Sequence, residues 1–162
     1  MTDLEYKRFY ARLYRLFDNA TPLKTDCGVL CKKACCKGDE NTGMLLFPGE
    51  ETTLKVKEAD GRRYAVCGGN CSRSERPLSC RIFPFAPVQY PDGRPAVTVD
   101  PRGFNICPLV RQADSVAFSP LFIRRMRVVS KLLSKDEACR DFIAEITGEI
   151  TDILTLNDKL RG

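Results

Sequence analysis

The sequence predicts an α+β protein, mainly α, whose terminal helices pack around an irregular, cysteine-rich metal-binding centre with a few short strands. Two observations support this class. Amphipathic repeats of helical period occupy both ends of the chain, and cysteines, prolines and glycines gather between them. The 162 residues are enough for one domain with its own core. We therefore expect a single domain over 1–162, with a cysteine-cluster core at 27–108 and helical flanks at 1–26 and 118–162.

The first expected element is an amphipathic helix over residues 2–18. Thr2 and Glu5 have the spacing of a capping box at its start. Apolar and aromatic residues recur every three or four positions, which is typical of a helix face buried in a core. This stripe consists of Tyr6, Phe9, Tyr10, Leu13, Tyr14 and Phe17. A turn over 19–26 should follow it.

The centre predicts short elements separated by turns. Asp60-Gly61 is a favourable turn pair for a hairpin, and the many prolines and glycines of 67–91 predict irregular structure there. The expected strands are 44–47, which Pro48-Gly49 would end, the hairpin strands 53–57 and 63–66, and 96–99 after a turn at Pro91-Asp92-Gly93.

Two helices are expected near the C-terminus. Ser119-Pro120 is a typical helix start, and the first helix should run to about 133. Ser134 and Glu137 have capping-box spacing and predict a second helix to about 159. Cys139 lies on this last helix, apart from the other thiols, and is expected to be a spare thiol. The apolar stripe of the last helix is Phe142, Ile143, Ile146, Ile150, Ile153 and Leu154.

The chain contains nine cysteines and no histidine. Thiols gathered in this way form disulfides or hold a soft metal ion, although they can also be ordinary buried or redox cysteines. A disulfide framework needs an oxidising compartment. The N-terminal residues are charged and lack an apolar signal segment, and no apolar run approaches the roughly 18 residues of a membrane helix. We expect a cytoplasmic protein that binds metal and has no membrane partner.

The net charge of +5 is modest, and many basic residues accompany the cysteines. We expect these side chains to stabilise thiolates, which is favoured over nucleic-acid binding. The cations concerned are Lys32, Lys33, Lys37, Arg73, Arg76 and Arg81. A further basic run, Arg124, Arg125, Arg127 and Lys131, is typical of the solvated face of a helix.

The cysteine spacing follows a recognisable pattern. Cys27-x3-Cys31-x3-Cys35-Cys36 is followed by Cys67-x3-Cys71 and then by Arg76-Pro77-x2-Cys80-Arg81-x-Phe83-Pro84. Together these segments resemble the YkgJ-like cysteine-cluster family, whose members are described as zinc- or iron-chelating domains. The resemblance covers 27–87. The commonest family form separates the first cysteines by two residues, whereas this chain uses three.

The resemblance implies metal binding without a settled reaction. It suggests seven ligands: Cys27, Cys31, Cys35, Cys36, Cys67, Cys71 and Cys80. Some family members occur fused to or within flagellin lysine methylases, which suggests a link to methyl transfer. Cys107 is an eighth candidate because it is the remaining thiol outside the last helix.

The expected chemistry follows from the ligand type. Thiolates select zinc or iron–sulfur clusters over magnesium and calcium, and both zinc and a [4Fe–4S] cluster take four. Zinc is favoured over an iron–sulfur cluster. The eight thiols suit two sites, or one site with spares. If the stretch between them is helical, Cys31 and Cys35 share a face, whereas Cys35 and Cys36 diverge.

Catalysis has little support in the sequence. Without histidine, no His-based acid–base pair or Cys–His nucleophile can form, and phosphate-binding glycine loops are absent. Glu50, Glu51 and Glu58 are expected to be solvated surface carboxylates. The predicted function is zinc or iron binding in a structural or metal-handling role. The alternatives are an iron–sulfur protein for electron transfer or for assisting a methyltransferase-type reaction, and a zinc-knuckle adaptor for nucleic acid or protein.

Overall fold

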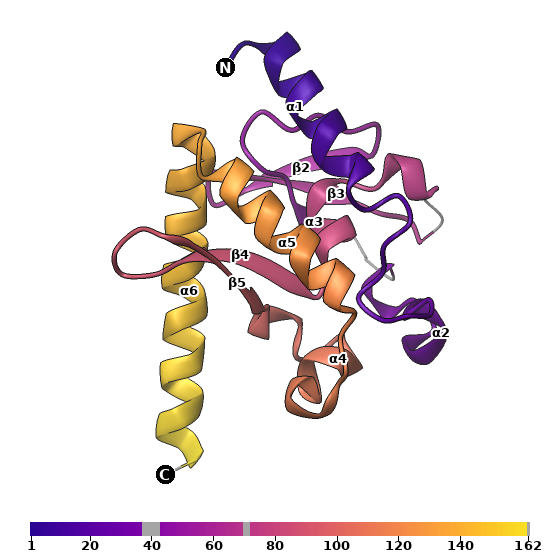
Figure 1. Ribbon diagram of the computed structural model, residues 1–162, viewed down its shortest axis with the longest axis vertical. Coiled ribbons are helices and arrows are strands. Elements are labelled where there is room, and N and C mark those ends of the chain that lie inside the picture. Colours follow the sequence, from indigo (N-terminus) through magenta and orange to yellow (C-terminus); the bar gives the residue numbers. More distant parts are fainter. Residues whose placement is uncertain (37–42, 70–71, 162) are drawn as a thin grey trace.

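The computed structural model describes residues 1–36, 43–69 and 72–161, with the side chains of 160 and 161 left out (Figure 1). The helices are α1 (Asp3–Arg15), α2 (Gly28–Cys31), α3 (Leu78–Ile82), α4 (Pro108–Arg111), α5 (Pro120–Leu133) and α6 (Glu137–Arg161). The strands are β1 (Met44–Leu45), β2 (Lys55–Ala59), β3 (Arg62–Val66), β4 (Phe85–Gln89) and β5 (Pro95–Val99). Short 3-10 turns span Ala34–Cys36, Arg73–Glu75, Pro101–Gly103 and Ala113–Ser115. The expected class, α+β and mainly α, is confirmed.

Helix α1 begins with the predicted capping box. The Thr2 amide donates to Glu5 Oε2 at 2.6 Å, and the Glu5 amide donates to Thr2 Oγ1 at 3.4 Å. Two of the helix's initial orphan amides thereby gain acceptors. Tyr10 and Leu13 are buried, and Phe17 continues the buried face just beyond the helix. The aromatic stripe is therefore a packing surface.

The hairpin about Asp60-Gly61 is also confirmed. Asp60 and Gly61 both adopt positive φ, 52° and 71°, and Ala59 pairs with Arg62 across the turn. These are the dihedral signs of the two-residue turn that best matches strand twist. Strand β1 pairs antiparallel with β3, which gives the sheet order β1-β3-β2. β1 is shorter than expected because Phe47 turns into the core.

The prediction that 67–91 is irregular is wrong. This stretch contains α3 and β4, and β4 pairs antiparallel with β5 from Phe85↔Val99 to Gln89↔Pro95. Phe85 packs in the cluster that contains α5 residues, whereas Ala86 packs against Ile146 and Ile150 of α6. Alternate β4 residues thus bury against different helices. Apolar burial on both faces stabilises the strand in spite of Pro87, which a two-stranded ribbon tolerates because both its strands are edges.

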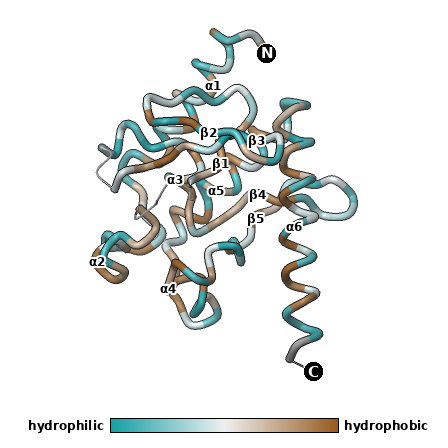
Figure 2. The backbone as a smooth tube through the Cα atoms, turned by 180° about the vertical axis from the view of Figure 1, so that it is seen from behind, coloured by the Kyte–Doolittle hydropathy of each residue, from teal (hydrophilic) through white to brown (hydrophobic). Residues whose placement is uncertain are grey.

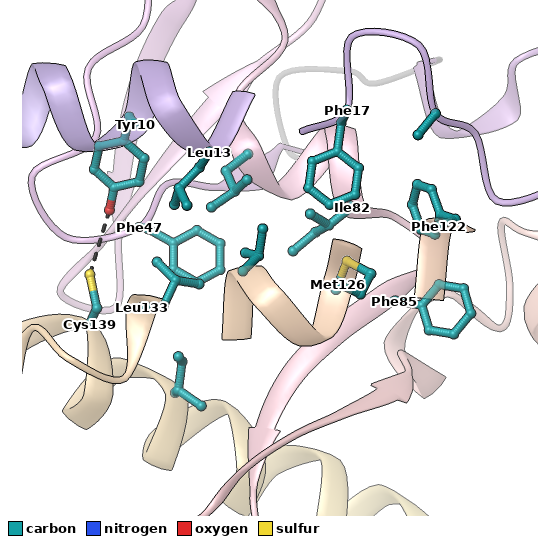
Figure 3. Packing of buried hydrophobic residues seen from close by; sticks show 14 residues of the cluster. Tyr10, Leu13, Phe17, Phe47, Ile82, Phe85, Phe122, Met126, Leu133 and Cys139 are labelled. Carbon is teal, nitrogen blue, oxygen red and sulfur yellow. Dashed lines mark hydrogen bonds between the residues drawn. The ribbon is translucent and has the colours of Figure 1, made fainter. Parts of the chain in front are cut away.

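The main core lies between α1, α5, the start of α6 and the β4–β5 ribbon (Figure 3). Leu13 comes from α1, Phe122 and Met126 from α5, and all three side chains are fully buried. Helix α5 begins as predicted, because Ser119 Oγ accepts a hydrogen bond from the Phe122 amide. Much of the central segment belongs to this core: Phe47, Leu78, Ile82 and Phe85 are members.

Helix α6 begins at a different cap from the predicted Ser134. Asp136 Oδ1 accepts a hydrogen bond from the Cys139 amide at 3.0 Å, whereas Ser134 donates to the Ser130 carbonyl at the end of α5. The two helices are so close in sequence that Ser134 ends the first one. Asp136 supplies the carboxylate that the N-terminus of α6 favours.

The apolar stripe of α6 is buried over its first half. Ile143, Ile146 and Ile150 are buried, whereas Leu154 is 47% exposed where α6 extends past the body of the protein (Figure 1). Hydrophilic and hydrophobic residues alternate along this helix (Figure 2). Among the described helices, none has the length and apolar character that crossing a membrane requires.

Gly49 and Gly93 allow a test of close packing in the fold. Both have positive φ, 69° and 80°, but a Cβ at Gly49 would overlap the Tyr6 ring of α1, and one at Gly93 would meet nothing. We expect Gly93→Ala to cost about 1 kcal/mol from backbone strain. Gly49→Ala should cost about 1–3 kcal/mol more because of overpacking. Urea denaturation of both variants would measure this, and equal losses would contradict the packing assignment.

Candidate metal centre

Helix α2 positions the first two cysteines. Cys27 is its N-cap, and the Cys31 thiol lies one turn later, where it donates to the Cys27 carbonyl at 3.8 Å. Asp26 Oδ1 accepts a hydrogen bond from the Gly28 amide at 2.9 Å and fixes the entry to the turn. The single helical turn therefore ends at Cys31. The stretch from Cys31 to Cys35 does not form a continuous helix.

The chain reverses direction immediately after α2. Lys32 and Lys33 both adopt positive φ, 50° and 56°, and the Lys33 amide donates back to the Gly28 carbonyl at 3.0 Å. Left-handed residues end a helix and cannot continue it. The condition under which Cys31 and Cys35 would share a helix face is therefore not met. A 3-10 turn instead carries Cys35 and Cys36 back beside α2.

Four thiols from two distant segments line one small cavity, the first thiol cavity, of about 20 Å³. Cys27, Cys31 and Cys35 approach from the α2 side, and Cys107 approaches from the N-cap of α4. The α2 and α4 segments lie at the same end of the molecule (Figure 1). Cys107 is buried beside Leu109 and Val110, with Cys27 packed against this group. Apolar packing thus places Cys107 at the cavity.

A second thiol cavity, of about 80 Å³, adjoins the first. Cys27 and Cys35 border both cavities, and Cys36 and Cys80 complete the second one. Its lining also includes the cations Lys33, Arg73, Arg76 and Arg81. Cations near thiols favour the ionised form that binds metals. Four of the six predicted cations thus lie at this cavity; Lys32 is not in its lining, and Lys37 lies outside the described residues.

The remaining cysteines differ in their placement. The Gly69 amide donates to Cys67 Sγ at 3.4 Å, and a Cβ on Gly69 would lie 3.4 Å from the Cys36 carbonyl, so the loop after β3 approaches the cluster. Cys71 lies outside the described residues. Cys139 is fully buried in the main core, with its sulfur 3.6 Å from the Tyr10 hydroxyl (Figure 3). Cys139 is thus a core residue, separate from the cluster.

Glu50 holds the helix that carries Cys80. The expectation that Glu50 is a solvated carboxylate is wrong, because it is fully buried. It accepts hydrogen bonds from the amides of Leu78 at 2.6 Å and Phe47 at 3.0 Å, and from the Tyr14 hydroxyl at 2.6 Å. Glu50 thereby connects three segments: helix α1 through Tyr14, the turn that contains Phe47, and the first residue of α3, Leu78. Glu51 and Glu58 are exposed, as expected.

Arg81 anchors the other side of α3. Its guanidinium donates to the carbonyls of Arg76 at 2.7 Å and Ser74 at 2.8 Å, pairs with Asp18 at 3.2 Å, and lies over the Tyr14 ring. Arg81 was expected to stabilise the thiolates, but these contacts join it to the backbone of the preceding loop and to the side chains of Asp18 and Tyr14. From the sequence alone, an arginine next to a cysteine could either stabilise the thiolate or hold neighbouring segments in place, and no local pattern distinguishes the two roles.

Arg73 also makes backbone contacts, donating to the carbonyls of Phe17 at 3.0 Å and Ala20 at 2.8 Å. The basic run on α5 behaves differently. Arg124, Arg127 and Lys131 are exposed, as the solvated face of a helix should be, whereas Arg125 is half-buried.

Phe83 separates the thiols from the rest of the interior. It lines both thiol cavities and also a larger cavity described below. Gly103 backs its ring, since a Cβ at that position would lie 2.8 Å from Phe83 Cζ. Ile106 lines the first thiol cavity and the larger one as well. Phe83 and Ile106 therefore form a shared wall.

Burial makes two of the cluster thiols, those of Cys27 and Cys35, weak acids in the absence of a metal. Burial, reinforced by the nearby Asp26 carboxylate, raises the pKa of Cys27 to about 11. Cys35 keeps some solvent contact, yet desolvation and then the neighbouring Cys36 raise its pKa to about 12. Because the thiolate is the nucleophilic form, such thiols are poorly suited to covalent catalysis. Metal ligation would displace their protons.

The donor chemistry fits a soft metal ion, and the two cavities gather donors from separate segments. As placed, the side chains do not form a finished ligand sphere: in the part of the chain that the structure describes, no three Cys, Asp or Glu side chains are arranged to hold a metal ion. Tetrahedral zinc requires four sulfurs at about 2.3 Å. Ligation would therefore require the thiols lining a cavity to turn toward its centre.

Comparisons with known proteins leave the site to be judged on its own residues. No protein-family model, no curated protein and no solved structure matches this chain.

Proposed function

We propose that the protein binds zinc through clustered cysteine thiolates, in a structural or metal-handling role. The observation that supports this best is the first thiol cavity. Cys107 is far along the chain from Cys27, Cys31 and Cys35, yet all four border a single space of about 20 Å³. Four thiols are the full ligand set of a structural zinc site.

The size of the first thiol cavity favours a single ion. About 20 Å³ is close to the space that one water molecule needs, and a cluster of four irons and four sulfides is far larger. We therefore assign zinc to Cys27, Cys31, Cys35 and Cys107. Cys36 and Cys80 border the second thiol cavity, and Cys67 and Cys71 are candidates through the family resemblance. On the same motif, we propose a relationship to the YkgJ-like family.

An iron–sulfur centre is the second candidate, and the second thiol cavity favours it. This space is about 80 Å³, has four cysteines in its lining, and is bordered by Lys33 and Arg73. Positive charge near cluster thiolates supports such centres. A brown protein with visible absorbance that bleaches on reduction would identify an iron–sulfur protein, whereas a zinc protein is colourless.

We expect Cys31→Ser to lose most of the metal that the wild-type chain retains after purification without air. The serine hydroxyl is a poor ligand for soft metals, so a four-thiolate site loses a quarter of its donors. Elemental analysis by mass spectrometry, reported as metal per chain, would measure the loss. Cys107→Ser should have the same effect in spite of its distance in sequence.

Cys139→Ser is the matched control for these variants. The serine can retain the polar contacts of Cys139 with Tyr10 and with the Pro48 carbonyl, and its metal content should equal that of wild type. Equal metal loss from Cys139→Ser and Cys31→Ser would contradict the assignment. Wild-type protein without metal, with all nine thiols titratable, would overturn the proposal itself.

A further inference from the structure

A separate cavity of about 710 Å³ lies across the shared wall from the thiols. It is bordered by β1, the β2–β3 turn, α3, β4 and α6. Its volume falls within the roughly 300–1,000 Å³ typical of small-molecule sites. The proposed metal binding does not use this cavity.

The lining of the cavity combines an apolar interior with charged groups. Phe47, Ile82, Phe85 and Ile146 come from the two apolar clusters and supply apolar surface. The charged lining residues are four carboxylates and two guanidiniums: Asp60, Asp100, Glu145, Glu149, Arg62 and Arg102. The lining therefore carries an excess of two negative charges.

The two arginines are already engaged by carboxylates. Arg102 donates from all three of its guanidinium nitrogens, to both oxygens of Asp100 and to Glu149 Oε2 at 3.0 Å. Arg62 donates from Nη1 to Glu149 and from Nη2 to Glu145 Oε2 at 3.1 Å. An anion entering the cavity would meet the negative excess of the lining and two guanidiniums whose charge is already paired with carboxylates.

Two carboxylates at the cavity, those of Asp60 and Glu145, can still accept hydrogen bonds from a ligand. Glu145 Oε1 and both side-chain oxygens of Asp60 accept no hydrogen bond from the described residues. Glu145 is 61% exposed at its side chain and Asp60 is exposed at the hairpin turn, so both are accessible to a ligand. These open acceptors lie at a cavity whose lining also includes the apolar residues Phe47, Ile82, Phe85 and Ile146.

We propose that this cavity binds a small organic cation, an ammonium or amidinium group carried on an aromatic or alkyl body. The apolar walls would bury the body, and Asp60 and Glu145 would accept hydrogen bonds from the cationic head. The inference rests on the cavity lining and is independent of any metal at the cysteines.

Isothermal titration calorimetry with phenethylamine and with 3-phenylpropionate tests the charge preference. The two probes have the same aromatic body and opposite charge. We expect phenethylamine to bind the full chain more tightly by at least about tenfold, because the propionate would be repelled by the negative excess of the lining and would find both arginines already paired with carboxylates. Equal or tighter binding of 3-phenylpropionate, or no binding of phenethylamine, would overturn the proposal.

Two isosteric variants locate the binding. Asp60→Asn retains a residue that tolerates positive φ, and Glu145→Gln changes an exposed side chain, so both should fold. Each should weaken phenethylamine binding by about two- to fivefold, as expected for an exposed ion pair. Glu58→Gln, an exposed carboxylate outside the cavity lining, is the control. Unchanged affinity in both cavity variants would contradict the site, even if the amine binds.

Discussion

Replacing Glu50 with alanine should lower the free energy of unfolding by about 2–6 kcal/mol. The substitution removes the acceptor for two backbone amides, those of Leu78 and Phe47. Each amide donor left unsatisfied in the interior costs about 1–3 kcal/mol. Urea denaturation followed by circular dichroism would measure the loss.

The neighbouring Glu51 provides a matched control. It is exposed and pairs with Arg63 at 3.6 Å. An exposed ion pair contributes about 0–1 kcal/mol, so Glu51→Ala should change stability little. Equal stability of Glu50→Ala and Glu51→Ala would show that Glu50 does not hold α3 to α1 and to the turn that contains Phe47.

Removing metal should open the cysteine segments to protease while the two sheets stay protected. This expectation rests on the proposed function. Zinc binding to thiolates contributes on the order of 10 kcal/mol, and the α2 segment contains no fully buried residue that could replace it. We therefore expect trypsin to cut the stripped protein at Lys32 and Lys33 at least roughly tenfold faster than the metal-bound protein.

The central strands should resist cleavage in the same experiment. Phe47, Leu78 and Phe85 are members of the main core, so apolar packing holds the segment just after β1, α3 and β4 without metal. Sites in the hairpin, at Lys55 and Arg62, should be cut slowly in both forms. Mass spectrometry of the first fragments identifies the cleaved bonds, and re-addition of zinc should restore protection. Equal resistance with and without metal, or first cuts in the hairpin, would contradict this expectation.

Local signals predicted the elements that local interactions determine. The capping box of Thr2 and Glu5, the Asp60-Gly61 turn and the Ser119 cap each involve residues within a few positions of one another. The structure matches these predictions. The start of α6 was misplaced because Ser134 and Asp136 are both good caps, and Ser134 instead ends α5.

Elements stabilised by distant contacts were missed. Prolines in 67–91 suggested irregular structure, yet β4 forms because Phe85 and Ala86 bury against different helices. Glu50 was misjudged for a related reason. Its three partners are Tyr14 of α1, Phe47 in the turn before Glu50, and Leu78 of α3. Nothing near Glu50 in the sequence indicates that these segments meet around its carboxylate.

The candidate metal centre was partly predictable. Spacing alone grouped Cys27, Cys31 and Cys35 and set Cys139 apart, and the structure places them accordingly. The way the ligands divide between cavities was not predictable. That division depends on the reversal at Lys32 and Lys33 and on the packing that brings Cys107 to Cys27.

The ring of Phe83 acts as a partition one side chain thick between three compartments. Gly103 sets its position, because any larger residue there would push the ring toward the thiols or the larger cavity. If the proposed metal and the proposed amine bind on opposite sides of this partition, their effects on each other are equal. The factor by which the amine changes the metal affinity is then the factor by which the metal changes the amine affinity. A side chain at position 103 would therefore change the partition between the thiol cavities and the larger cavity.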